Sequence, residues 1–295
     1  MDKNRDRSGI DRPIFIIGSG RSGTTILYNI MALHPQVYWF SNISNIFPRR
    51  RLPLLAHRLL DAPLAGLILK RRIIKHPRPR FALRPGEGGN IFHSVCGFKH
   101  DRKSTAEDHD PGAENCLRRA ILAHRQKTGK RRFLNKQTAN TQRIGLIDRM
   151  FPDALYIHII RDGRGVANSL YQTDWWRDVD VWWLGARAGD WRQGEDPIVL
   201  CGENWRRNVE EILSHRERLG GRYLEIRYEH LIKAVKGTVA EILSFCDLSP
   251  VASYSNMLPE ALPDMNKKWR RDLNETQQKQ LAQAIGTDLK HLGYE

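Results

Sequence analysis

The chain has 295 residues, of which 27% are charged and 40% are hydrophobic. That length suits one α/β domain with a substantial core, and no uncharged apolar run reaches the ~18 residues of a membrane-spanning helix. The formal net charge of +15 favours anionic ligands or surfaces as partners.

Short aliphatic segments alternate with helical ones, which predicts a single α/β domain with a P-loop-like parallel sheet and helices on both faces. Strands are expected at 13–17, 37–40, 132–135, 154–160 and 222–228. Helices are expected at 24–33, 50–74, 112–128, 140–150, 163–172, 203–218, 235–246 and 274–285, with a loop over 76–92. Residues 1–11 are expected to form a disordered tail, and residues 12–295 the domain.

The first strand runs directly into a glycine-rich turn and then into a helix. The turn reads Gly18-Ser19-Gly20-Arg21-Ser22-Gly23-Thr24-Thr25. A strand, a glycine-rich turn and a helix in this order form a cradle for phosphate, because the first amides of the helix lack intrahelical partners. The spacing is that of a nucleotide P-loop, but Thr24 stands where an NTPase has its phosphate-binding lysine. The loop therefore favours a phosphate other than the β/γ pair of a magnesium triphosphate, with an ordinary strand-to-helix turn or a degenerate NTPase loop as alternatives.

This loop resembles the 5′-phosphosulfate-binding loop of sulfotransferases, which use 3′-phosphoadenosine 5′-phosphosulfate (PAPS) as donor. A second motif supports the resemblance, because the strand at 154–160 ends in Arg161 and Ser169 follows eight residues later. That pair resembles the 3′-phosphate signature of the family, and an arginine fork with a nearby hydroxyl suits a phosphate. The bacterial group related to tyrosylprotein and carbohydrate sulfotransferases looks most similar.

The resemblance implies roles for particular residues of this chain. The 5′-phosphate is expected to bind Arg21 and the loop backbone, which comprises Gly20, Ser22, Gly23, Thr24 and Thr25. Lys136 resembles the active-site lysine that neutralises the leaving oxygen, Tyr228 resembles a tyrosine near the nucleotide, and Lys268 lies in a Lys-Trp segment that closes over it. A sulfuryl group carries less negative charge than a phosphoryl group, so no metal is expected.

The general base does not follow from the resemblance. Asn42 stands about where tyrosylprotein sulfotransferases have a glutamate, and Thr138 stands where the cytosolic enzymes have a histidine. By elimination, the base is expected in the glycine-rich stretch 84–93. Glu87 is the first candidate and His93 the second, with a turn acid and a packed histidine as the alternative interpretations.

Residues 49–84 hold eleven Lys/Arg and one acid, interleaved with leucine and isoleucine. The pattern favours a core-facing helix with a solvated basic face, and the alternative is peripheral contact with an anionic membrane. No nucleic-acid recognition motif accompanies the charge, so no nucleic-acid partner is expected. Six of the eight tryptophans lie between 175 and 205, where they either line an acceptor site or pack an irregular insertion.

The four scattered cysteines contain no C-x-x-C pair, which favours reduced, packed thiols in a cytoplasmic protein. The predicted activity is transfer of a sulfuryl group from PAPS to a hydroxyl or amine of a glycan, a lipid or a small molecule. The alternatives are a P-loop kinase or NTPase and a non-catalytic protein that binds membrane surfaces.

Overall fold

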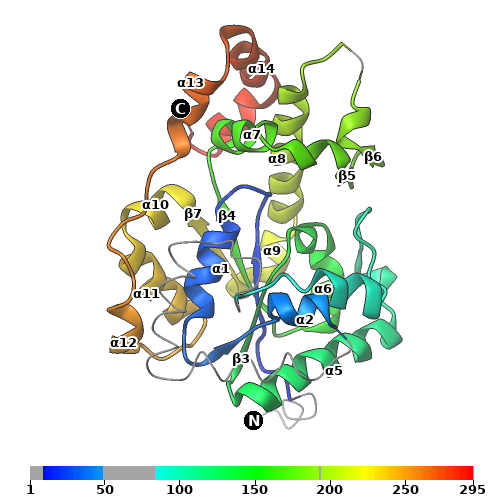
Figure 1. The fold of residues 1–295 in the computed structure, drawn as a ribbon, viewed down its shortest axis with the longest axis vertical. Helices are drawn as coiled ribbons and strands as arrows, with labels where there is room; N and C mark the ends of the chain where they lie inside the picture. Colours follow the sequence, from blue (N-terminus) through cyan, green and yellow to red (C-terminus); the bar gives the residue numbers. More distant parts are fainter. Residues whose placement is uncertain (1–8, 49–83, 193, 295) are drawn as a thin grey trace.

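A five-stranded parallel sheet forms the centre of the computed structural model, which describes residues 9–48, 84–192 and 194–294 (Figure 1). The strand order is β2-β3-β1-β4-β7. The strands are β1 (Ile14–Ile17), β2 (Val37–Tyr38), β3 (Arg132–Lys136), β4 (Leu155–Ile160) and β7 (Tyr223–Arg227). Since every pair in this sheet is parallel, all five strands end at the same edge, where α/β sheets place their ligands. The predicted parallel sheet is confirmed.

Alternate residues of β1 face two separate cores. Ile14 and Ile16 pack on one face of the sheet with helices α1 (Thr24–Ala32), α10 (Tyr228–Lys233) and α11 (Val235–Phe245). Phe15 and Ile17 pack on the other face with α5 (Pro111–Thr128) and α6 (Ile144–Met150). Figure 1 shows these two groups of helices on opposite sides of the strands. A strand buried on both faces explains the continuous apolar run that marks β1 in the sequence.

A third cluster lies beyond the carboxyl ends of the strands, at the top of Figure 1. It joins α7 (Gly163–Tyr171), α8 (Pro197–Leu213) and α14 (Glu275–His291). Trp176 and Trp205 are buried in it, so the interpretation of the tryptophans as packing an insertion holds for these two. Trp175, in contrast, is 53% exposed.

The remaining elements are short, and most of them are absent from the sequence prediction. The α-helices are α2 (Asn42–Ile46), α9 (Arg216–Leu219), α12 (Ala252–Ser255) and α13 (Trp269–Asp272). A two-stranded hairpin is formed by β5 (Asp180–Val181) and β6 (Ala186–Arg187). The short 3-10 and π segments are η2 (Ile91–Val95), η3 (Ala106–Asp108), η4 (Thr138–Arg143), η5 (Asp174–Asp178), η6 (Ala188–Asp190), η7 (Gly220–Arg222) and η8 (Asn266–Lys268).

Element boundaries differ from those predicted at several places, and the expected helices 140–150 and 203–218 begin at Ile144 and end at Leu213, respectively. The expected helix 203–218 begins earlier, at Pro197, because Asp196 caps it and a proline occupies its first turn. The expected strand 222–228 ends one residue early, because Tyr228 begins α10. The last helix extends to His291 and not to residue 285.

The prediction of four reduced cysteines is wrong for two of them. Cys96 and Cys116 form a disulfide that joins the segment after η2 to α5. Their separation of 20 residues gives no sequence signal, since it is the packing of α5 against η2 that brings them together. Cys201 and Cys246 are free and buried, as expected.

Several predictions fall partly or wholly on residues outside those described. Residues 1–8 and 49–83 lie outside the structure's described ranges. The disordered tail, the basic helix with its alternative of membrane contact, and the first part of the loop 76–92 therefore stay predictions. In the described part of the chain, no helix combines the length and the apolar character needed to cross a membrane.

Candidate active site

The glycine-rich turn after β1 wraps tightly around the start of α1. Gly23 caps α1 at a φ of 94°, a conformation that L-residues with a Cβ rarely adopt. A Cβ at this position would lie 2.5 Å from Cδ2 of Tyr228, so the space also requires glycine. No side chain caps the helix, so its first amides are left for a ligand. The sequence interpretation of this turn as a phosphate cradle is consistent with this geometry.

A cavity of about 550 Å³ opens at the sheet edge where the strands end. We call it the strand-end cavity. Of the residues predicted for the site, those that line it are Gly20, Arg21, Gly23, Thr24, Thr25, Glu87, Lys136, Arg161, Ser169 and Tyr228. These residues come from six segments of the chain, and parallel strand ends bring them to one place.

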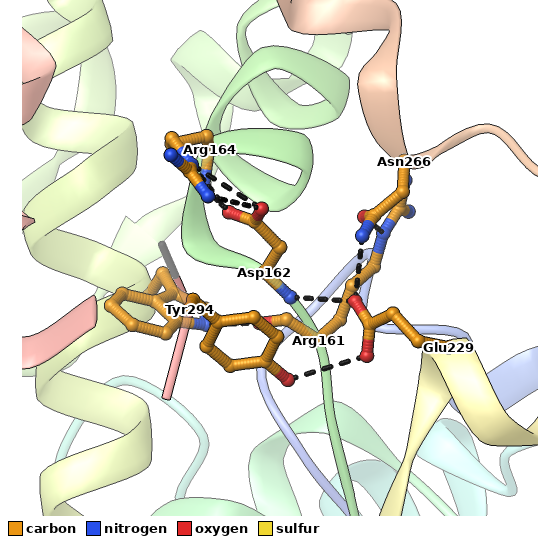
Figure 2. Close-up of polar contacts among 7 residues, drawn as sticks. Arg161, Asp162, Arg164, Glu229, Asn266 and Tyr294 are labelled. Atoms are coloured by element: carbon orange, nitrogen blue, oxygen red, sulfur yellow. Dashed lines mark hydrogen bonds and ion pairs between the residues drawn. The ribbon is translucent and has the colours of Figure 1, made fainter. Parts of the chain in front are cut away.

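Arg161 follows β4 and is held at all three of its guanidinium nitrogens. Nε donates to Oδ1 of Asn266 at 2.9 Å, and the two terminal nitrogens donate to the carbonyl oxygens of Arg21 at 3.0 Å and Met265 at 3.1 Å. Figure 2 shows Arg161 and Asn266 side by side. The guanidinium also lies 4.5 Å from the centre of the Tyr228 ring. Each terminal nitrogen keeps a second N–H, so the group is fixed in place with donors left for an anion.

Ser169 connects the two predicted phosphate sites. Its Oγ accepts a hydrogen bond from Nε of Arg21 at 2.9 Å, across 148 residues of sequence. Arg21 has a φ of 70°, which is uncommon for a non-glycine residue. Together with the Arg161 contact to its carbonyl, these bonds place Arg21 between the glycine-rich turn and α7.

Lys136 and Glu87 form an ion pair inside the cavity. The lysine side chain is 5% exposed, whereas the Glu87 side chain is 47% exposed. Two neighbouring contacts fix the backbone of the Glu87 loop: Nδ2 of Asn135 donates to the Glu87 carbonyl at 3.0 Å, and the Tyr28 hydroxyl donates to the Gly86 carbonyl at 2.9 Å. The carboxylate is therefore held beside the lysine but faces solvent on its other side.

Three predicted residues do not line the cavity. The His93 ring is half-buried and bonded at both nitrogens, to the Phe98 carbonyl at 2.8 Å and to Nε2 of Gln137 at 2.9 Å. Burial lowers the pKa of His93, which leaves it neutral over a wider pH range. Lys268 is exposed in η8, and Ser22 is buried within the glycine-rich turn.

Further residues that line the cavity include Arg84, Thr138, Trp175 and Met265. Arg84 belongs to the stretch 84–93 in which the base is expected, and Thr138 stands where the cytosolic enzymes have a histidine. Trp175 is one of the six tryptophans for which lining an acceptor site is one of two interpretations. Met265 carries no sequence signal, and its place in the cavity follows from tertiary packing.

The lining of the cavity favours an anionic ligand. Its cations are Arg21, Arg84, Lys136 and Arg161, and its only acid among the residues described is Glu87. Burial raises the pKa of Tyr228, so its phenol stays protonated beside Arg161. Among the described residues, no group of three or more His, Cys, Asp or Glu is arranged to hold a metal ion. The site can therefore bind phosphate-like groups and can offer one carboxylate and one lysine to a reaction.

Comparisons with known proteins give a family match and similar folds. A family model described as the Sulfotransferase family matches residues 13–253. An uncharacterized protein of Aquifex aeolicus (strain VF5) is 25% identical over 251 residues, which are 80% of this chain and 26% of that protein. The chain thus matches about a quarter of that relative's length.

Solved structures share the fold at low identity. Sulfotransferase STF9 from Mycobacterium avium aligns with a TM-score of 0.63 and 16% identity, over 97% of this chain and 78% of that chain. Sulfotransferase STF1 from Mycobacterium tuberculosis H37Rv aligns with a TM-score of 0.55 and 18% identity, over 93% and 77% of the two chains.

Proposed function

The chain belongs to the sulfotransferase family, as its strand-end motifs predict, and from this premise we propose that it transfers the sulfuryl group of PAPS to a hydroxyl or amine of an acceptor. One observation carries the proposal. The two groups of residues expected to bind phosphate, Arg21–Thr25 and Arg161 with Ser169, contribute to the lining of the same cavity as Lys136 and Glu87. A ligand that carries phosphates on both the 3′ and the 5′ position of one ribose can engage both groups of residues, and PAPS is such a ligand.

The cavity residues fit the donor by charge and by hydrogen bonding. Arg21 and the uncapped amides of α1 would hold the 5′-phosphate, and Arg161 with Ser169 would hold the 3′-phosphate. PAPS supplies the activated sulfuryl group. The donor set in the cavity is nitrogen-rich and cationic, and the proposed transfer uses no metal.

We propose that Glu87 and Lys136 act on opposite sides of the transferred group. The acceptor oxygen forms a bond to sulfur, the acceptor proton goes to the Glu87 carboxylate, and the bond from sulfur to the 5′-phosphate oxygen breaks. Lys136 moves from Glu87 to the leaving oxygen, where it neutralises the charge that develops. The ion pair seen here must therefore open when the donor binds, and this frees the carboxylate to accept the proton.

A nucleotide panel tests the donor. Adenosine 3′,5′-bisphosphate (PAP) should raise the melting temperature more than AMP or ATP with magnesium, because it alone engages both phosphate sites. Arg161→Ala should weaken PAP binding by about 2–4 kcal/mol, since it removes a charge-assisted fork. Stronger stabilisation by ATP with magnesium would favour a P-loop kinase. Equal stabilisation by PAP and AMP would exclude the 3′-phosphate site.

A transfer assay tests the base. With labelled PAPS and a cell extract as acceptor source, Glu87→Gln should abolish transfer and leave PAP binding intact. Glu107→Gln, at an exposed position in η3, is the matched control and should transfer normally. Near-normal turnover by Glu87→Gln would exclude Glu87 and direct the same test to His93. Lys136→Ala should lower turnover more than PAP affinity.

Cytoplasmic location is also a proposal. Buried thiols at Cys201 and Cys246 are compatible with it. The Cys96–Cys116 disulfide points to more oxidising surroundings, because such bonds persist mainly outside the cytosol. Quantifying free thiols in protein isolated under alkylating conditions distinguishes a cytoplasmic location, with four free thiols, from more oxidising surroundings, with two.

A further inference from the structure

We propose that Glu229 is a positioning residue that sets the preference for a 3′-phosphate by orienting Asn266 and, through it, Arg161. This inference rests on the proposed function, because it assumes that Arg161 binds the 3′-phosphate of the donor. Glu229 itself does not line the strand-end cavity.

Glu229 joins three distant parts of the chain at one carboxylate (Figure 2). Oε1 accepts hydrogen bonds from the backbone N–H of Asp162 at 3.1 Å and from Nδ2 of Asn266 at 2.7 Å. Oε2 accepts from the hydroxyl of Tyr294 at 3.3 Å. The carboxylate thus ties the start of α7, the start of η8 and the C-terminal segment to the start of α10.

The contact with Asn266 decides which way its amide faces. Because Nδ2 donates to Glu229, Oδ1 is the atom turned toward Arg161, and it accepts from Nε at 2.9 Å. If the amide turned over, its NH2 group would face the guanidinium, and two donors would meet. Glu229 therefore holds the partner that fixes the plane of Arg161.

Glu229 and Tyr228 act on Arg161 from neighbouring positions. The Tyr228 ring supports the guanidinium at 4.5 Å, and Glu229 secures its edge through Asn266. Both residues lie in the first turn of α10, directly after β7. This turn therefore sets both the plane and the rotation of the arginine fork.

The negative charge of Glu229 repels a nearby phosphate and so cannot itself favour binding. The contribution of Glu229 to the site is therefore its hydrogen bonds. Glutamine at this position keeps an oxygen for Asp162 and Asn266, and the Tyr294 hydroxyl can turn to accept from its amide. Alanine keeps none of these contacts. The two variants therefore separate orientation from charge.

The test measures the affinities of the full-length chain for PAP and AMP by calorimetry. Glu229→Ala should weaken PAP binding about tenfold and leave AMP binding unchanged, because only PAP uses Arg161. Glu229→Gln should keep the wild-type ratio of the two affinities. Asn266→Ala should cause the same loss as Glu229→Ala, and the double variant should lose no more, because the two residues act in series.

Glu225→Ala is the matched control. The Glu225 carboxylate accepts a hydrogen bond from the Tyr223 hydroxyl at 3.1 Å on the same strand, and Glu225 lies outside the cavity. This variant should leave both affinities unchanged. If Glu229→Ala fails to fold, Asn266→Ala and Glu229→Gln carry the test. A wild-type chain that binds PAP no better than AMP overturns the proposed function. A wild-type chain that prefers PAP, with a preference that survives in Glu229→Ala or in Asn266→Ala, overturns the role of Glu229 alone.

Discussion

Replacing Gly23 with alanine tests how closely the glycine-rich turn is fitted to Tyr228. The new Cβ would lie 2.5 Å from Cδ2 and 3.0 Å from Cε2 of that ring, so the ring must move. The φ of 94° adds a backbone cost of about 1–2 kcal/mol for any L-residue with a side chain. Overpacking against a ring of the core adds about 1–3 kcal/mol. We expect the free energy of unfolding to fall by roughly 2–5 kcal/mol in total.

Gly129→Ala separates the two contributions. Gly129 follows α5 at a φ of 66°, and a Cβ there would meet nothing within 4 Å. This variant should therefore lose only the backbone contribution of about 1–2 kcal/mol. Urea unfolding followed by circular dichroism gives both values, and their difference measures the contact with Tyr228.

The same substitution reports on the binding site. The Tyr228 ring supports Arg161, so its displacement should weaken PAP binding in Gly23→Ala. PAP binding in Gly129→Ala should equal that of the wild type. If Gly23→Ala and Gly129→Ala lose equal stability, the ring does not obstruct position 23 and the reasoning is refuted.

Three further predictions concern the loop that carries Glu87, the disulfide and pH. Asn135→Ala should lower turnover by about 10- to 100-fold and leave PAP affinity unchanged, because it releases the Glu87 carbonyl. Steady-state kinetics measures the turnover and calorimetry the PAP affinity, and a parallel loss of both would contradict this prediction. Replacing Cys96 and Cys116 with serine should lower the free energy of unfolding by about 3 kcal/mol, as expected for a loop of this length, and an unchanged urea midpoint would contradict it. Burial lowers the pKa of His124 to about 4, so the unfolded chain binds a proton that the folded chain excludes. The free energy of unfolding should therefore fall as pH falls from about 6.5 to 4, and this part of the slope should vanish in His124→Phe.

The sequence predicts the sheet and the strand-turn-helix geometry of the glycine-rich turn well because both depend on local patterns. The β1 residues Ile14–Ile17 are buried on both faces, and such strands read as unbroken apolar runs. The glycine-rich turn after them must adopt positive φ angles, which restricts its residue types. Arg161 is predictable for the same reason, since it directly follows a strand whose neighbours are parallel.

The residues that support the site are not predictable in this way. Glu229 and Asn266 are 37 positions apart, and neither belongs to a periodic pattern. Their contact exists only because η8 returns to the start of α10. The cysteine pair is hidden for a similar reason, and the short helices around residues 252–272 are too brief to leave a hydrophobic period.

The neighbours Asn135 and Lys136 hold Glu87 at two points, the first at its carbonyl and the second at its carboxylate. For protein engineering, this means that a backbone change at Asn135 or Lys136 is expected to disturb the loop that carries Glu87 as well. Changes that leave these contacts intact are best sought elsewhere in the lining of the cavity. Trp175 lines the same cavity from a single-turn helix and is more than half exposed. A library at that position can reshape the cavity while the contacts of Asn135 and Lys136 with Glu87 are kept.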